Sequence, residues 1–270
     1  MDLKKNRVRD LIRQGKATLG TRLLNTGPGM IEILGQTGLF DYIEFVAEYA
    51  PWTLYDLDNM ARAAELHNIS SMIKIDAVPR SYIAAKALAS GIQNFLFTDI
   101  RTADDAEEAV KSIRSEPKGI MGIGSYRVVG YVLTTCSAAD YRKICDDAVI
   151  AIMIEKKSAV ENLEQILSLE DIGMVQFGPS DYGLSIGLSG EPGTDWGLNS
   201  PKVKEAELKT IKTALRMNKR PRVELQTLDG IQQYIDLGVR DFSIGTDIRI
   251  LHNYWKEKGE EARRIFSQLE

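Results

Sequence analysis

AVIAIMIEKKSAVENLEQILSLEDIGMVQFGPSDY, residues 148–182, holds two apolar runs, and each run leads into a carboxylate. IAIMI ends at Glu155, and MVQFGPS ends at Asp181. Apolar residues at helical spacing join the two runs, so the stretch indicates strand, helix, strand. Strands joined by a crossover helix lie parallel, which would bring both carboxylates to one end of a sheet. Two acids there, with Gly178 and Pro179 beside the second, suggest a metal site.

The same alternation of apolar strand and helical pattern runs through the rest of the chain. Such strands, covered by helices, are typical of a buried parallel sheet. About eight of them in 270 residues predict an α/β protein, a (β/α)8 TIM barrel formed as one domain over residues 1–270. A doubly wound sheet is the competing fold, but ATLGTRLLNTGPG (17–29) lacks its G-x-G-x-x-G turn. An extra helix is expected before the first strand and a helical extension after the last. The expected strands are 17–24, 40–48, 70–76, 94–100, 148–155, 172–178, 220–226 and 239–247.

Composition narrows the class of protein. A net charge of −4 gives no electrostatic reason to expect nucleic acid as a partner. No apolar run approaches the roughly 20 residues of a membrane span, and the charged N-terminal stretch does not resemble a signal peptide. Two cysteines, Cys136 and Cys145, form no disulfide or zinc pattern, so a cytoplasmic location is expected. Both histidines, His67 and His252, fall in helical patterns, so the chemistry must depend on carboxylate, Lys, Arg and Tyr side chains, with or without a metal.

In a barrel the chemistry lies at the carboxyl ends of the strands. Glu155 and Asp181, on adjacent strands, could each give one oxygen to a hard divalent cation. Carboxylates at strand ends also cap the following helix, and that alternative stays open for Asp181. SIGLSGEPGTDWGLNSP (185–201) is expected to be a loop or lid, in which Trp196 could close over a ligand or pack at a subunit contact. The functional side chains expected at strand ends are Arg22, Glu48, Tyr49, Lys74, Asp76, Thr98, Asp99, Glu155, Asp181, Glu224 and Asp247.

These residues carry a resemblance to a known family. IEKKSAVENLEQIL followed by GMVQFGPSDYGLSIG is similar to the paired signature of the HpcH/HpaI aldolases, the metal-dependent class II pyruvate aldolases that include 2,4-dihydroxyhept-2-ene-1,7-dioate aldolase. KNRVRDLIRQGKATLGT, FDYIEFVAEYAPWTLYDL, GIMGIGS and SIGTDIRIL fall in the same order as in that family. The resemblance covers nearly the whole chain, and GPSDYGLSIG is its most specific part.

The resemblance implies a carbon–carbon lyase that acts through a metal-bound pyruvate enolate. Such an enzyme cleaves 4-hydroxy-2-oxo acids to pyruvate and an aldehyde, or forms them from the same two compounds. Glu155 and Asp181 match the two metal ligands, with Mg²⁺ the expected ion and Mn²⁺ or Co²⁺ as alternatives. Gly178, Pro179, Ser180 and Asp181 match the segment whose amides hold the pyruvate carboxylate. The family also implies a homo-oligomer, a trimer or hexamer, often with the C-terminal helix exchanged between neighbours.

The chain departs from the family pattern across the barrel mouth. Tyr49 follows Glu48 where the family has a histidine, and Lys74 stands where it has a substrate-contacting arginine. Lysine keeps the positive charge but loses the bidentate fork of arginine. Arg22 is a candidate replacement for that guanidinium and a candidate substrate-binding residue. Arg127 is a second candidate, with an exposed surface position as its alternative.

Tyr49, Lys74 and Glu48 are therefore the candidate catalytic residues. Tyr49 could act as acid or base if it shares its proton with Lys74 or Glu48, or it could simply pack beside residues 51–52. Lys74 could instead form a rim ion pair with Glu48 or Asp76. The alternative functions are decarboxylation or citrate-lyase-like cleavage through the same enolate, and a non-catalytic barrel that binds an oxo acid.

Overall fold

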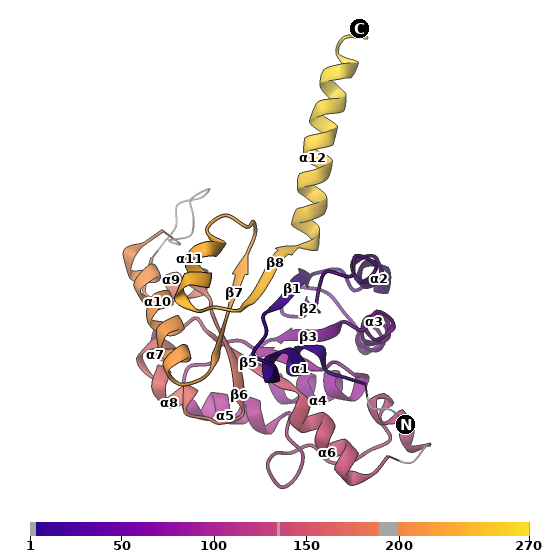
Figure 1. Ribbon diagram of the computed structural model, residues 1–270, viewed down its shortest axis with the longest axis vertical. Helices are drawn as coiled ribbons and strands as arrows, with labels where there is room; N and C mark the ends of the chain where they lie inside the picture. Colours follow the sequence, from indigo (N-terminus) through magenta and orange to yellow (C-terminus); the bar gives the residue numbers. More distant parts are fainter. Residues whose placement is uncertain (1–3, 134–135, 189–198, 270) are drawn as a thin grey trace.

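Eight parallel strands close a barrel in chain order in the computed structural model, which describes residues 4–133, 136–188 and 199–269 (Figure 1). The first and last strands pair directly, with Thr18 opposite Asp241, so the sheet has no edge. This closure confirms the predicted (β/α)8 TIM barrel and excludes the open doubly wound sheet. The strands are β1 (Thr18–Leu23), β2 (Tyr42–Val46), β3 (Ser70–Ile75), β4 (Asn94–Phe97), β5 (Val149–Ile154), β6 (Ile172–Phe177), β7 (Arg220–Leu225) and β8 (Asp241–Thr246).

Helices surround the barrel, and their starts follow the local sequence signals. Thr53 and Thr102 form capping boxes at the starts of α3 and α5, and Pro28 and Pro201 open α2 and α10. The predicted extra helices are both present, as α1 and α12. The helices are α1 (Arg7–Arg13), α2 (Pro28–Gln36), α3 (Leu54–Leu66), α4 (Arg80–Ser90), α5 (Ala103–Lys111), the 3₁₀ helix η1 (Arg127–Val132), α6 (Ala138–Asp147), α7 (Lys157–Glu161), α8 (Leu163–Leu167), α9 (Pro179–Ser185), α10 (Pro201–Arg216), α11 (Ile231–Leu237) and α12 (Asp247–Phe266).

Local details differ from the sequence-based expectations. The helix expected over 158–170 is two short helices, because Asn162 leaves the helical conformation at ψ 15°. Asparagine favours such breaks, since its side chain competes for backbone hydrogen bonds. The strand expected over 40–48 ends at Val46, so Glu48 lies in the turn that follows. The predicted loop at 185–201 is described only at its two ends, and Trp196 lies outside the described residues.

The barrel interior has two unlike halves. One half is apolar, and Val8 from α1 closes it at the amino ends of the strands. The other half carries charged and amide side chains from β1, β2, β6 and β7, of which Glu44, Gln176 and Arg222 are buried and the other two are partly exposed. This division places a polar floor beneath one side of the barrel mouth. The apolar side chains are Met72, Leu96, Val149, Ala151, Met153 and Met174, and the polar ones are Arg22, Glu44, Gln176, Arg222 and Glu224.

Helix α12 extends away from the barrel (Figure 1). Its only buried residue is the first, Asp247, whose carboxylate accepts hydrogen bonds from the Leu24 and Asn25 amides at 3.0 and 2.9 Å. The rest of the helix is largely exposed. No helix in the part of the chain that the structure describes is both long and apolar enough to cross a membrane.

Candidate active site at the carboxyl end of the barrel

Glu155 is a buried carboxylate at the end of β5. Its residue is 2% exposed, and its Oε1 accepts a hydrogen bond from the Asp99 amide at 2.7 Å. Asp99 directs that amide inward from a left-handed conformation, at φ 54°, which aspartate tolerates better than most residues. Burial raises the pKa of Glu155, the Asp99 amide and Lys74 oppose the rise, and the negative charge of Asp181 adds to it. Glu155 and Asp181 follow the adjacent parallel strands β5 and β6, so both lie at the carboxyl end of the barrel.

Gly178 packs directly against Glu155. A Cβ at position 178 would lie 2.7 Å from Glu155 Cβ, 2.8 Å from its Oε2 and 2.9 Å from Met153 Cε. Only glycine, which has no Cβ, allows the Glu155 side chain to approach the backbone at position 178 this closely.

The backbone of residues 178–181 offers fewer donors than the sequence suggested. The Gly178 amide donates to the Ile154 carbonyl at 3.0 Å, and Pro179, at the first position of α9, has no N–H. The amides of Ser180 and Asp181 belong to the first turn of α9, whose N–H groups have no partner within the helix. Of the four residues expected to bind a ligand carboxylate, only Ser180 and Asp181 therefore have backbone amides available to do so.

Lys156 bridges two carboxylates on the outer side of this site. Its Nζ lies 2.8 Å from Asp99 Oδ1 and 3.3 Å from Asp181 Oδ1. Burial lowers the pKa of Lys156, but Asp99, Glu155 and Asp181 outweigh it, so the net pKa is raised and the group is an ammonium. Sequence reasoning missed Lys156, although it directly follows Glu155.

Lys74, Glu48 and Tyr49 meet across the mouth. Lys74 Nζ lies 2.5 Å from Glu48 Oε2 and donates to the Tyr49 hydroxyl at 3.1 Å. Burial lowers the pKa of Lys74, but Glu48 and Tyr49 outweigh it and raise the pKa overall. Burial raises the pKa of the Tyr49 phenol, and the ammonium of Lys74 only partly opposes this. Both groups therefore keep their protons at neutral pH, and the ion-pair partner of Lys74 is Glu48 rather than Asp76.

The two arginines proposed as guanidinium replacements lie in different places. Arg22 is at the mouth, but it is held by Glu224 and lies 3.6 Å from Glu44 Oε1. Arg127 pairs with Glu65 and donates to the Ser90 carbonyl at 2.5 Å. These partners are at or near the C-terminal ends of α3 and α4, next to the amino ends of the strands. The expectation that Arg127 serves the mouth is therefore wrong, and so is the exposed-surface alternative, because its side chain is only 13% exposed.

Arg222 centres a buried polar ring that the sequence reasoning did not identify. Its guanidinium donates to Glu44, to the Gln176 carbonyl oxygen and, at 2.7 Å, to the Tyr42 hydroxyl. Burial raises the pKa of Tyr42 to about 12, although Arg222 opposes the rise. Gln176 then donates to Glu224 at 3.3 Å, and Glu224 also binds Arg22. The ion pair of Arg22 with Glu44, at 3.6 Å, returns to the partner of Arg222 and closes the ring.

The donor set at the mouth fits a hard divalent cation. Within residues 4–133, 136–188 and 199–269 no group of three or more His, Cys, Asp or Glu side chains could hold a metal. The family resemblance assigns the metal to two carboxylates only, Glu155 and Asp181. A cation such as Mg²⁺ is commonly bound through one or two carboxylates, with waters and substrate in its other positions. The Asp99 amide binds Oε1 of Glu155, so Oε2 is the oxygen of that carboxylate placed to bind a cation.

Comparison with known proteins identifies relatives of this chain. The sequence profile of the HpcH/HpaI aldolase/citrate lyase family matches residues 23–221. The chain is 27% identical over 253 residues to the hydroxypyruvate/pyruvate aldolase of Roseobacter denitrificans, covering 93% of this chain and 94% of that one. It is 26% identical over 247 residues to a 4-hydroxy-2-oxo-heptane-1,7-dioate aldolase of Escherichia coli, covering 91% and 90%.

A solved structure shares the fold as well. The HpcH/HpaI aldolase from Desulfitobacterium hafniense superposes with a TM-score of 0.83 at 21% identity, covering 96% of this chain and 97% of the other. The family profile spans more than half of the chain and includes both Glu155 and Asp181. The chain therefore belongs to the HpcH/HpaI aldolase/citrate lyase family.

Proposed function

We propose that this protein is a divalent-metal-dependent carbon–carbon lyase that cleaves or forms 4-hydroxy-2-oxo acids, with Mg²⁺ as the expected ion. Family membership supports the carbon–carbon lyase class, and two relatives are named as aldolases of oxo acids. The observation that supports the finer proposal is the Lys74 ammonium, which is paired with Glu48, bonded to Tyr49 and near enough to oppose the rise in the pKa of Glu155. A cation held by Glu155 and Asp181 would supply Lewis-acid stabilisation of the negative charge that develops on a 2-oxo acid.

The protein's own groups divide the remaining tasks. The Ser180 and Asp181 amides are placed to receive a carboxylate of the substrate at the start of α9. The Lys74 ammonium adds a fixed positive charge where negative charge develops on the oxo-acid fragment. Because it is buried and paired with Glu48, this ammonium is already oriented before the substrate binds.

Tyr49 is the proposed proton-transfer group. In the condensation direction its protonated phenol donates a proton to the aldehyde oxygen as the new carbon–carbon bond forms. In the cleavage direction the same oxygen takes the proton back from the C4 hydroxyl, so cleavage requires the phenolate. The hydrogen bond from Lys74 stabilises that phenolate, and the 56% exposure of Tyr49 leaves it open to the mouth.

The direct test of the proposal is exchange of the methyl protons of pyruvate. The protein is incubated with Mg²⁺ or Mn²⁺ and pyruvate in deuterated buffer, and the methyl signal is followed by NMR. Metal-dependent loss of that signal would support formation of an enolate at this site. Binding of pyruvate without exchange would indicate a non-catalytic oxo-acid-binding barrel, and absence of binding would exclude pyruvate as the nucleophile.

A different reaction of the same oxo-acid fragment is the second candidate. The family includes citrate lyases, and the mouth has Tyr49 and Lys74 where the resemblance leads one to expect histidine and arginine. Decarboxylation or citrate-lyase-like cleavage would also use the two-carboxylate site. Product analysis separates these reactions, because decarboxylation releases CO₂, whereas aldol cleavage releases an aldehyde and no CO₂.

Replacing Tyr49 with Phe should lower the rate of aldol cleavage by about 100-fold or more, the usual contribution of a positioned acid–base group. The phenolate of Tyr49 becomes more populated as the pH increases, and the raised pKa of this group moves that change to higher pH. Wild-type cleavage should therefore accelerate as pH rises towards that raised pKa, and the Phe variant should lose this dependence. Steady-state rates between pH 7 and 10 measure both effects. The exposed Tyr55 on α3 provides the control, since Tyr55→Phe should keep the rate and the pH profile.

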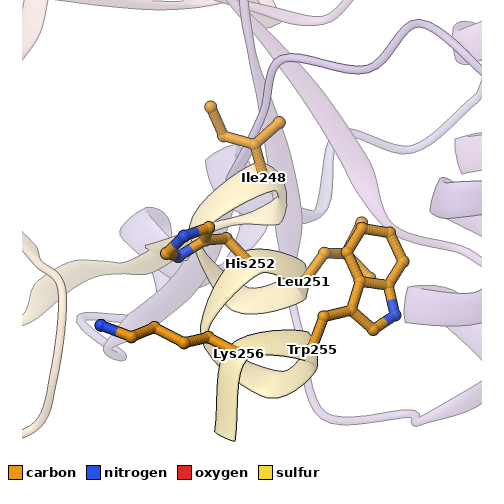
Figure 2. Close-up of a pocket in the computed structure, with 5 residues that line it drawn as sticks. All are labelled: Ile248, Leu251, His252, Trp255 and Lys256. Atoms are coloured by element: carbon orange, nitrogen blue, oxygen red, sulfur yellow. The ribbon is translucent and has the colours of Figure 1, made fainter. Parts of the chain in front are cut away.

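We also propose that the protein forms a homo-oligomer through α12. Figure 2 shows Ile248, Leu251, His252, Trp255 and Lys256 standing out from this helix around a shallow pocket. The apolar side chains of Ile248 and Trp255 are 52% and 65% exposed, and exposed apolar groups clustered on one helix are normally covered in the assembled protein. Light scattering coupled to size exclusion should give a trimer or hexamer. Trp255→Glu should shift it towards the monomer, and a wild-type mass of about 30 kDa would contradict the proposal.

A further inference from the structure

Lys156 contacts one of the two proposed metal ligands and directly follows the other in sequence. It follows Glu155 in sequence, and its ammonium lies between Asp99 and Asp181. Asp99 connects this lysine to Glu155, because the Asp99 amide donates to the Glu155 carboxylate at 2.7 Å. A positive charge therefore lies beside one oxygen of Asp181.

We propose that Lys156 is a tethered counter-cation that competes with the divalent cation for Asp181 and so sets the metal affinity of the site. The inference rests on the proposed function, since it takes Glu155 and Asp181 as the metal ligands. Lys156 is a positioning residue here, not a ligand and not a catalytic group. Its side chain is 19% exposed, so solvent screens its charge only in part.

The physical argument is electrostatic. A divalent cation bound to Asp181 must lie a few ångströms from the Lys156 ammonium, because both interact with the same carboxylate. Like charges at such a distance repel strongly in a partly buried site. The metal must also displace or share the contact that Lys156 makes with Oδ1. Both effects weaken metal binding, so removing the ammonium should strengthen it.

Asp99 has the opposite influence. Its carboxylate holds Lys156 at 2.8 Å, closer than Asp181 does at 3.3 Å, and so draws the ammonium away from the metal ligand. Without this negative charge, Asp181 would be the remaining carboxylate that contacts the Lys156 ammonium. The site would also lose the electrostatic attraction between the Asp99 carboxylate and the divalent cation. Asn tolerates the left-handed conformation at position 99 and keeps the amide that binds Glu155. Asp99→Asn should therefore weaken metal binding without disturbing the Glu155 contact.

The experiment measures Mn²⁺ binding without substrate, by the loss of the free Mn²⁺ signal in electron paramagnetic resonance. Lys156→Met is expected to bind Mn²⁺ at least about 10-fold more tightly than the wild type, and Asp99→Asn less tightly. Lys157 is the matched control, because it is adjacent in sequence, exposed, and paired at 3.8 Å with Glu161. Lys157→Met should leave the affinity unchanged. Thermal unfolding confirms that each variant is folded, and Lys156→Gln replaces the Met variant if that one is not.

The opposite directions make the result diagnostic. A merely structural role for the Asp99–Lys156 pair would weaken Mn²⁺ binding in both variants. Unchanged or weaker binding by folded Lys156→Met, with a wild type that binds Mn²⁺, would overturn the inference and leave the proposed function intact. If neither the wild type nor Lys156→Met binds Mn²⁺, both proposals fail. Binding that appears only in Lys156→Met would support competition in its strongest form.

Discussion

Glu155→Gln is expected to abolish the metal-dependent activity of this protein. The substitution keeps the size of the side chain and an oxygen that can accept the Asp99 amide hydrogen bond, so the fold should survive. It removes the negative charge that a hard cation requires. Metal affinity should fall by about 100-fold or more, since even residues that only support a metal ligand contribute about 10- to 100-fold. Pyruvate exchange should fall by roughly 1,000-fold, corresponding to several kcal/mol of lost charge stabilisation.

Two measurements check this expectation, namely Mn²⁺ titration and metal-dependent methyl exchange. Glu161→Gln is the control, because Glu161 is an exposed acid at the end of α7, close to Glu155 in the sequence. That variant should match the wild type in both measurements. A Glu155→Gln protein that keeps wild-type metal affinity would refute the proposed ligand pair, whatever its activity.

Arg222→Met should cause the largest loss of stability of any single change in the barrel interior. Arg222 and Glu44 are fully buried, and the arginine also satisfies Gln176 and Tyr42. Removing one partner of a buried ion pair leaves an uncompensated charge, at a cost of about 3–5 kcal/mol. Chemical denaturation of the variant should show a free energy of unfolding lower by that amount.

The companion variant tests the cause of the loss. Adding Glu44→Leu to Arg222→Met removes the stranded carboxylate, and replacing a buried pair by apolar residues is often neutral or stabilising. The double variant should therefore recover most of the lost stability, although Tyr42 and Gln176 still lack their partner. Arg216→Met is the surface control, since its exposed pair with Glu164 should contribute less than about 1 kcal/mol. A loss below that level in Arg222→Met would show that the buried pair does not stabilise the fold.

The fold and the carboxylate pair could be predicted because both depend on order along the chain. Apolar strands that alternate with helices close in parallel, which fixes the end of the barrel where Glu155 and Asp181 lie. The meeting of Tyr49 with Lys74 followed from the same rule applied to neighbouring strands. These expectations needed only the identity of each strand-end residue and the direction of its strand.

Contacts that depend on side-chain reach could not be predicted in this way. Lys156 was overlooked because its ammonium acts several bonds from its own backbone, beside Asp99 and Asp181. The left-handed conformation of Asp99 has no signature in TDIRT. Arg127 was assigned to the wrong end of the barrel, because a glycine-rich loop does not indicate which helix ends it follows.

The polar ring left a partial signal. In strands β1, β2 and β7, charged residues interrupt apolar sequence as TRL, IEF and RVEL, and a period of two turns them towards the interior. Pairing could not be read from this pattern, since Arg22 and Glu224 are 202 residues apart in sequence.

The two unlike halves of the barrel interior differ in how easily their side chains can change conformation. Methionine is unbranched and readily changes conformation to fill irregular space. Met72, Met153 and Met174 form part of the wall on the β3, β5 and β6 side, where the proposed metal ligands also lie. The ion-paired ring begins beside this wall, because Gln176 lies in register with Met153, and directional hydrogen bonds hold its members. The methionine wall is therefore the part of the interior that can adjust its shape, and the ring is the part that fixes it.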